Sequence, residues 1–485
     1  MDSAQNDWKL PTVSTVPAAP DDTPPLDVKQ VRSNLWGRVV ASGIWVVGAR
    51  VCGILSTVLT NVVLARQLVP EAFGDFVVIC SIANAASLVA MVGMNIAVVR
   101  FVAEQLASDN VEEARHVFWL CFRLAGYGTL ITALVMFAGI CSSGSRLLDL
   151  DDPVRVALLT ACVLSIQAFC NMSAAALRGL GEMRYSGVLG GQGGVVGPMA
   201  NTVFLVLVSG FVLITKLTLV VALSVYLLAF VIALVAGSHW IRCTAHSVFK
   251  SSSVSSIEHR SPRLLASTLL AACLPMLVVQ ILGVASRQGG LWIAGVMCSQ
   301  HELPLYAGAN RAIQLVSIPM NMVSLSLMAF VPLLRAQQRL PELERILRVS
   351  AGWAAVPSFL ALAAFLIIPA PILEVFLGSS FRDAALLLSI LSLGQFVVVW
   401  TGASELALIF SGFERAASIV NAAAVLAIVV AGPFVVDSHG AVGLAVFSTA
   451  TTTAQSIALW LLTRRLVGIW THATPMWGLK GVGQS

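Results

Sequence analysis

Residues 217–238 read LTLVVALSVYLLAFVIALVAGS and contain no charged side chain. At ~1.5 Å per residue, an α-helix of this length is about 33 Å long, which is enough to cross the ~30 Å hydrocarbon core of a bilayer. Similar runs recur along the 485-residue chain, which is 58% hydrophobic and only 11% charged. Soluble domains are about 45–50% apolar and about 25% charged. The composition therefore excludes a water-soluble enzyme. A transmembrane β-barrel is excluded as well, because no long segment alternates apolar and polar residues.

We predict an all-α integral membrane protein with about twelve transmembrane helices. A Ser-rich, basic segment at 241–263 divides these helices into two six-helix bundles. The predicted domains are a disordered tail (1–35), an N-terminal bundle (36–240), the linker (241–263), a C-terminal bundle (264–466) and a second tail (467–485). The predicted spans are 39–64, 75–98, 118–141, 154–177, 187–213, 217–238, 264–286 (continuing to about 297), 305–334, 349–373, 384–411, 416–436 and 440–463.

The distribution of Lys and Arg predicts the orientation of the chain, because cytoplasmic loops are enriched in these residues. With the N-terminus placed in the cytoplasm, 20 of the 29 Lys and Arg residues fall on the inside, five on the outside and four within spans. This bias favours an even number of spans and two cytoplasmic termini. The predicted outside loops are short, so they offer no external domain in which sugar chemistry could take place.

The two halves of the chain also resemble each other weakly. A shift of about 230 residues relates EAFGDF (71–76) to HELPLY (301–306), and a shift of 231 relates Gly181 and Arg184 to Gly412 and Arg415. Since six spans separate the copies, both begin on the same side of the membrane. The pattern predicts parallel repeats, an arrangement known among secondary transporters.

The stretch 64–104, LARQLVPEAFGDFVVICSIANAASLVAMVGMNIAVVRFVAE, carries a family resemblance. It resembles the N-terminal signature of polysaccharide and O-antigen flippases of the multidrug/oligosaccharidyl-lipid/polysaccharide (MOP) superfamily, with Val69 where glycine is common. The counterpart LPLYAGA (303–309) has proline where that family has glycine. The resemblance implies a MATE-like flippase fold, alternating access and a lipid-linked saccharide as cargo.

Four arginines lie within the predicted spans, namely Arg50, Arg123, Arg287 and Arg311. A charge inside a bilayer is costly, about 2.5–3.5 kcal/mol for arginine at mid-helix, so each is a candidate substrate contact. Arg50 falls near the middle of its span, whereas Arg123 is close enough to a helix end for its side chain to reach the membrane surface. Arg287 and Arg311 fall toward outer helix ends, where either substrate contact or surface contact is possible.

Glu405 is the clear carboxylate within the spans. It could form an ion pair with an arginine, lie at the membrane interface, or carry a coupling proton. The excess of arginine over carboxylate favours an anionic cargo, because guanidinium groups match phosphate oxygens in bidentate geometry. A cavity for cationic drugs would instead contain intramembrane Asp or Glu.

These features predict a non-enzymatic flippase in the cell inner membrane that exports a polyprenyl-pyrophosphate oligosaccharide for surface polysaccharide synthesis. Its predicted partners are the lipid-linked oligosaccharide, membrane lipids, and a polysaccharide polymerase with its chain-length machinery; no nucleic acid is expected. No cofactor or metal is expected, because the nine cysteines lack metal-ligand spacing and the chain lacks a Walker motif. The alternatives are a cation-coupled multidrug exporter of the same superfamily and a membrane glycosyltransferase or polymerase.

Overall fold

The computed structural model describes residues 28–108, 110–147, 152–190, 197–214, 216–250 and 262–474, and all regular elements in these ranges are helices. In the first half they are α1 (Val28–Gln67), α2 (Pro70–Ala90), α3 (Met94–Ala107), α4 (Val111–Leu147), α5 (Pro153–Gly179), α6 (Met183–Leu189), α7 (Pro198–Val212) and α8 (Leu219–Lys250). In the second half they are α9 (Pro262–Met297), α10 (Glu302–Ala336), α11 (Leu340–Ile367), α12 (Pro369–Leu377), the 3₁₀ helix η1 (Ser379–Ala384), α13 (Ala385–Thr401), α14 (Ser404–Phe410) and α15 (Glu414–Val467).

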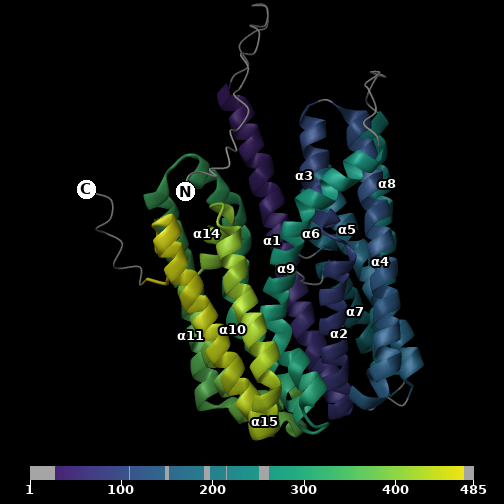
Figure 1. Ribbon diagram of the computed structural model, residues 1–485, viewed down its shortest axis with the longest axis vertical. Coiled ribbons are helices and arrows are strands. Elements are labelled where there is room, and N and C mark those ends of the chain that lie inside the picture. Colours follow the sequence, from purple (N-terminus) through teal and green to yellow (C-terminus); the bar gives the residue numbers. More distant parts are fainter. Residues whose placement is uncertain are drawn as a thin grey trace, which may run out of the picture. The chain divides into compact units, whose positions relative to one another are not determined.

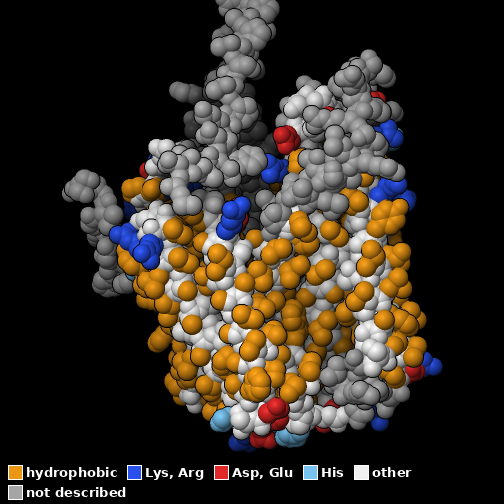
Figure 2. Space-filling view, in the orientation of Figure 1, with side chains coloured by type: hydrophobic (Ala, Val, Ile, Leu, Met, Phe, Trp, Pro, Cys, Tyr) orange, Lys and Arg blue, Asp and Glu red, His pale blue; other side chains and the backbone are white. Residues whose placement is uncertain are grey.

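The predicted all-α membrane fold is confirmed. Within the described residues, nine helices are long and apolar enough to cross a membrane. One of them, α15, covers the last two predicted spans, which are separated only by a kink at Gly440 (φ 60°, ψ −155°). On the face shown in Figure 2, hydrophobic side chains cover the middle and charged side chains gather toward the two ends, as expected for a protein embedded in a bilayer.

Several predicted spans are interrupted rather than continuous. Val92 and Gly93 adopt left-handed φ values of 50° and 76°, and they separate α2 from α3 within the span predicted at 75–98. Gly402, with φ 73°, separates α13 from α14. The span predicted at 187–213 comprises α6 and α7, and residues 191–196 between them lie outside the described residues. Left-handed φ values at Val92 and Gly93, and at Gly402, explain why α2 and α13 stop inside apolar sequence.

The repeat predicted from the sequence has a counterpart in the helix ends. Gly181 (φ 87°) and Gly412 (φ 85°) each follow a helix and precede the next one. At both positions the next residue donates its backbone N–H to a carbonyl five residues earlier: Glu182 to Leu177 at 2.9 Å, and Phe413 to Leu408 at 3.0 Å. Equivalent Schellman-type turns at a shift of 231 residues support a parallel repeat.

Helices of the same half pack against one another within the compact unit Trp45–Ser485. In the first half α5 contacts both α4 and α8, and in the second half α15 contacts α9 and α13 while α10 lies beside α11 (Figure 1). Helix α2 joins the halves because it contacts both α9 and α10. At this contact, a Cβ added to Gly74 would lie 3.1 Å from the backbone of Pro304, and Phe73 packs edge-on against Phe381 at 5.4 Å.

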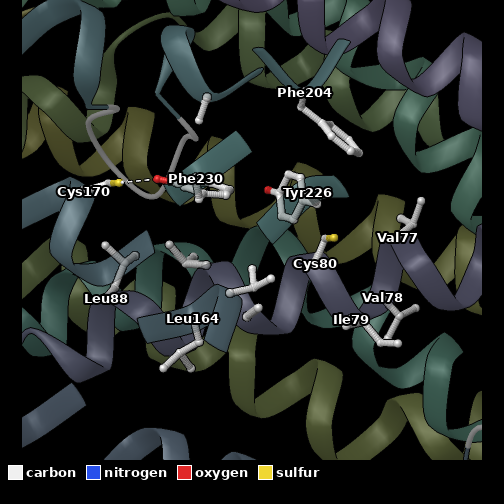
Figure 3. Packing of buried hydrophobic residues seen from close by; sticks show 14 of the residues in the cluster. Val77, Val78, Ile79, Cys80, Leu88, Leu164, Cys170, Phe204, Tyr226 and Phe230 are labelled. Atoms are coloured by element: carbon white, nitrogen blue, oxygen red, sulfur yellow. Dashed lines mark hydrogen bonds between the residues drawn. The ribbon is translucent and has the colours of Figure 1, made fainter. Parts of the chain in front are cut away.

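The core of the first half is rich in aromatic and small side chains. Tyr226 packs at 4.8–5.9 Å against Phe76, Phe204 and Phe230, which come from α2, α7 and α8. Figure 3 shows Cys80 beside this cluster, and it shows the thiol of Cys170 directed at the carbonyl of Phe230 (3.6 Å). This packing holds α2, α7 and α8 together in the first half.

The predicted domain limits are only partly within the described residues. Residues 1–27 of the first tail, 251–261 of the linker and 475–485 of the second tail lie outside them. Helix α1 already begins at Val28, and α8 continues to Lys250, so the ends of the predicted tail and linker are helical.

Candidate functional site

Arg50 lies on α1 and is only 8% exposed. Its guanidinium donates a hydrogen bond to the carbonyl of Gly190 at the end of α6 (3.2 Å), and its Nε has no partner. The close approach of α1 to α7 explains this burial: a Cβ added to Gly53 would lie 2.8 Å from Cα of Pro198. No carboxylate among the described residues forms an ion pair with Arg50.

Arg178, the penultimate residue of α5, interacts electrostatically with Arg50. Its Nε is also buried without a partner, and no described carboxylate pairs with it. Arg178 is absent from the sequence-predicted site residues, because the span predicted at 154–177 ends just before it. Helix α5 continues to Gly179, and this extension keeps Arg178 in the helix and near Arg50. Two uncompensated cations therefore lie together in the first half.

Arg311, on α10, interacts with Cys80 of α2 and Tyr226 of α8. Its Nε is a third buried arginine nitrogen without a partner, and again none of the described carboxylates forms an ion pair with it. The side chain belongs to a helix of the second half but lies against two helices of the first half. Arg311 is thus placed where the two halves meet.

Arg287 and Glu405, two of the predicted site residues, lie close together. Their nearest side-chain atoms, Nη1 and Oε2, are 3.9 Å apart, and the two side chains are 55% and 32% exposed. The break at Gly402 ends α13 and starts α14, so that Glu405 falls in the first turn of the new helix. A carboxylate is favourable there because backbone N–H groups at a helix N-terminus carry partial positive charge.

A chain of amide and hydroxyl groups continues from Glu405. Asn421 of α15 donates to Oε1 of Glu405 (2.8 Å), and Gln455, farther along the same kinked helix, donates to Oδ1 of Asn421 (2.7 Å). The Gln455 amide also lies 3.2 Å from the hydroxyl of Ser286, next to Arg287 on α9. The kink at Gly440 brings Asn421 and Gln455 together, because it folds α15 back on itself.

Arg123 is exposed on α4, on the same stripe as the exposed Trp119 and Tyr127, at four-residue spacing. No hydrogen bond or ion pair of Arg123 is recorded within the described part of the chain. This placement is the one in which a long side chain extends along a helix toward a polar surface. We therefore leave Arg123 outside the candidate site.

Comparison with known proteins identifies both the fold and the family. Three solved structures resemble this chain at low identity. The inward-facing conformation of a multidrug resistance MATE family transporter of the MOP superfamily has a TM-score of 0.63 at 16% identity, covering 86% of this chain and 94% of that one. The outward-facing conformation of such a transporter gives 0.53 at 16% identity, with 89% and 95% covered. A MOP superfamily transporter from Pyrococcus furiosus gives 0.57 at 15% identity, also with 89% and 95% covered.

These likenesses show that the chain has the MATE fold, as predicted. The search of curated proteins found no match to the sequence. A family model described as polysaccharide biosynthesis protein, however, matches residues 39–338, which is more than half of the chain. The chain is therefore a multi-pass membrane transporter in its fold, and it belongs to the polysaccharide biosynthesis protein family.

Proposed function

We propose that this chain is an inner-membrane flippase that moves a polyprenyl-pyrophosphate-linked oligosaccharide across the bilayer for surface polysaccharide synthesis. Membership of the polysaccharide biosynthesis family and a transporter fold support this proposal. The cargo would be delivered to a polymerase and its chain-length machinery on the far side of the membrane. Transport would proceed by alternating access between the two halves.

The pair of uncompensated arginines is the observation that carries the proposal. Arg50 and Arg178 lie close enough to repel each other, and no described carboxylate forms an ion pair with either. Burying unpaired cations in a membrane protein costs several kcal/mol, so such groups are retained where an anion will meet them. A pyrophosphate carries two phosphate groups, each able to accept paired hydrogen bonds from a guanidinium.

Arg287 and Arg311 would supply secondary contacts. Arg287 is half-exposed and retains donor capacity, while Arg311 has a buried Nε without a partner at the junction of the halves. Polar side chains between the helices could accept and donate hydrogen bonds to sugar hydroxyls. The P. furiosus transporter, which shares the fold, is described as having a binding pocket of reverse polarity that suggests a different function. A cationic site in this chain would fit the same division within the superfamily.

A cation-coupled multidrug exporter is the second candidate. It is favoured by Glu405, a carboxylate in the candidate site, and by the likeness to multidrug MATE transporters. Against it stands the position of Arg287 beside Glu405, with side-chain atoms 3.9 Å apart, since a guanidinium next to the carboxylate would repel a cationic drug. The exporter predicts loss of drug resistance on deletion of the gene, whereas the flippase predicts a change in lipid-linked saccharides.

The experiment that tests the proposal uses a strain that lacks the gene and is complemented with variants. Complete lipid-linked repeat units should accumulate on the cytoplasmic leaflet of the deletion strain while surface polysaccharide falls. Arg50→Ala should fail to restore export, and Arg50→Lys should restore it in part, because lysine keeps the charge but not the bidentate geometry. Arg242→Ala serves as control, since Arg242 is exposed on α8. Full export by Arg50→Ala would contradict the assignment of Arg50, and normal lipid-linked pools in the deletion strain would contradict the proposed function.

A further inference from the structure

The Glu405 carboxylate accepts a hydrogen bond at one end of a chain of amide and hydroxyl groups. Asn421 donates to its Oε1, Gln455 donates to Asn421, and the same Gln455 amide lies within hydrogen-bond distance of Ser286. An ionised carboxylate can only accept, and the donor of Asn421 satisfies one of its oxygens without any help from a cation. Asn421 itself is fully buried, so the amide that holds Glu405 is fixed in position. The carboxylate therefore has support that does not depend on Arg287.

Arg287 has no comparable second support among the described residues. Within the described part of the chain, its side chain contacts Oε2 of Glu405 at 3.9 Å, near the outer limit for an ion pair, and is 55% exposed. A guanidinium has five N–H donors, and a single contact at this distance leaves most of them for another acceptor. The pair lies beside Gly283 of α9, where an added Cβ would be in ordinary van der Waals contact with the Arg287 guanidinium (3.6 Å) and with Glu405 (3.8 Å).

We propose that Glu405 is a built-in competitor of the cargo for Arg287. When the pyrophosphate enters, Arg287 turns from Glu405 to a phosphate oxygen, and Glu405 remains held by Asn421. When the cargo leaves, Glu405 recovers Arg287 and the pair is neutral again. This inference rests on the proposed function, and it gives a specific role in binding and release to a carboxylate that would otherwise repel an anionic cargo.

The competition follows from the charges around Arg287 before and after the cargo binds. Before binding, the carboxylate offsets the charge of Arg287, so the guanidinium is not left as an isolated cation in the membrane. After binding, a phosphate group takes over that role and forms stronger, bidentate hydrogen bonds. Each exchange replaces one anionic partner by another, so the energetic difference is modest and the cargo is not trapped. Arg50 has no carboxylate partner among the described residues and would act as the permanent anchor.

The test measures the affinity of the purified full-length chain for farnesyl pyrophosphate, a short polyprenyl pyrophosphate, by titration in detergent. Glu405→Gln keeps an oxygen that can accept from Asn421 and removes the charge, so it should bind about fivefold more tightly, equivalent to about 1 kcal/mol for a half-exposed ion pair. Arg287→Gln should bind more weakly than the wild type. In the double variant, Glu405→Gln should bring no tightening, because the residue for which Glu405 competes is gone.

Glu374→Gln is the charge control, since it removes one carboxylate from an exposed position on α12. The affinity of this variant should equal that of the wild type. Apparent unfolding temperatures establish that each variant is folded. If Glu405→Gln does not fold, Glu405→Asp replaces it, because the shorter side chain withdraws the carboxylate from Arg287 and should also tighten binding.

Comparison of the two single variants with the double variant distinguishes competition for Arg287 from a general electrostatic repulsion between Glu405 and the cargo. Equal affinities of Glu405→Gln and wild type would overturn the inference while leaving the proposed function intact. The same tightening in the Arg287→Gln background would overturn it too, since Glu405 would then repel the cargo without acting through Arg287. A folded wild-type chain that binds no polyprenyl pyrophosphate would overturn the proposed function and the inference together.

Discussion

Replacing Thr471 by valine should destabilise the end of α13. The segment that follows α15 passes over this helix end, where the break at Gly402 leaves carbonyl groups without helical partners. The hydroxyl of Thr471 donates to the carbonyl of Thr401 at 2.7 Å, and the N–H of Ala473 donates to the carbonyl of Trp400 at 2.8 Å. A segment distant in sequence thus caps α13.

The magnitude follows from burial. Thr471 is fully buried, and Thr401 is 1% exposed, so water cannot replace the lost donor. Leaving a buried carbonyl unsatisfied costs about 1–3 kcal/mol, whereas valine preserves the shape of the threonine side chain. The expected loss of stability for Thr471→Val is therefore about 1–3 kcal/mol. Thr471→Ser retains the hydroxyl and should lose only the contribution of one methyl group, on the order of 1 kcal/mol.

The assay is thermal unfolding in detergent, followed by tryptophan fluorescence. Trp460 packs against Trp400 at 5.5 Å and Trp470 at 4.8 Å, so release of the segment should alter the emission as well as the unfolding temperature. The unfolding temperature should fall for Thr471→Val and remain closer to wild type for Thr471→Ser. If Thr471→Val unfolds at the wild-type temperature and Thr471→Ser does not differ from it, the capping argument is wrong.

Two further predictions concern packing and pH. Gly53→Val should destabilise the chain by about 1–3 kcal/mol, because its side chain would meet Pro198, whereas Gly48→Val on the same helix has open space around its Cβ and should be tolerated in thermal unfolding. Burial, and to a smaller extent the charge of Arg348, lowers the pKa of His472 from its ordinary value of 6.5. The unfolded chain consequently binds more protons than the folded chain as the pH falls below about 6.5, and stability is lost on acidification. His472→Gln should weaken the dependence of the unfolding temperature on pH between about 7.5 and 5.5; an unchanged dependence would show that this histidine contributes nothing to it.

The sequence was a good guide to the spans and a poor guide to where they break. A run such as 217–238 identifies a transmembrane helix because hydropathy depends on composition along one segment alone. The left-handed turn at Val92 and Gly93 lies within equally apolar sequence, so hydropathy carries no sign of it. The break at Gly402 was hidden for the same reason. These breaks matter for the site, because Glu405 owes its place at a helix N-terminus to one of them.

The types of residue in the candidate site were predictable from the sequence, but which of these residues lie side by side was not. Intramembrane position alone selected Arg50, Arg287 and Glu405 from the sequence. That Glu405 lies beside Arg287, and Arg178 beside Arg50, depends on packing between helices distant in the chain. The sequence contains a weak indication of Arg178, because this residue directly follows a predicted span. A shift of one residue in the predicted end of that span would have brought Arg178 into the list of candidates.

The coexistence of compensated and uncompensated arginines has a consequence for turnover. A site built only from cations like Arg50 would hold a pyrophosphate tightly in both orientations of a transporter, and release would be slow. A site built only from closed ion pairs would give an anion little reason to enter. Transport requires binding that is favourable enough for entry and weak enough for exit, the same balance that governs permeation through channels. On the proposed function, Arg50 and Arg178 set the affinity for the cargo, and Glu405 limits it by returning to Arg287. Removal of Glu405 should therefore improve binding while slowing export.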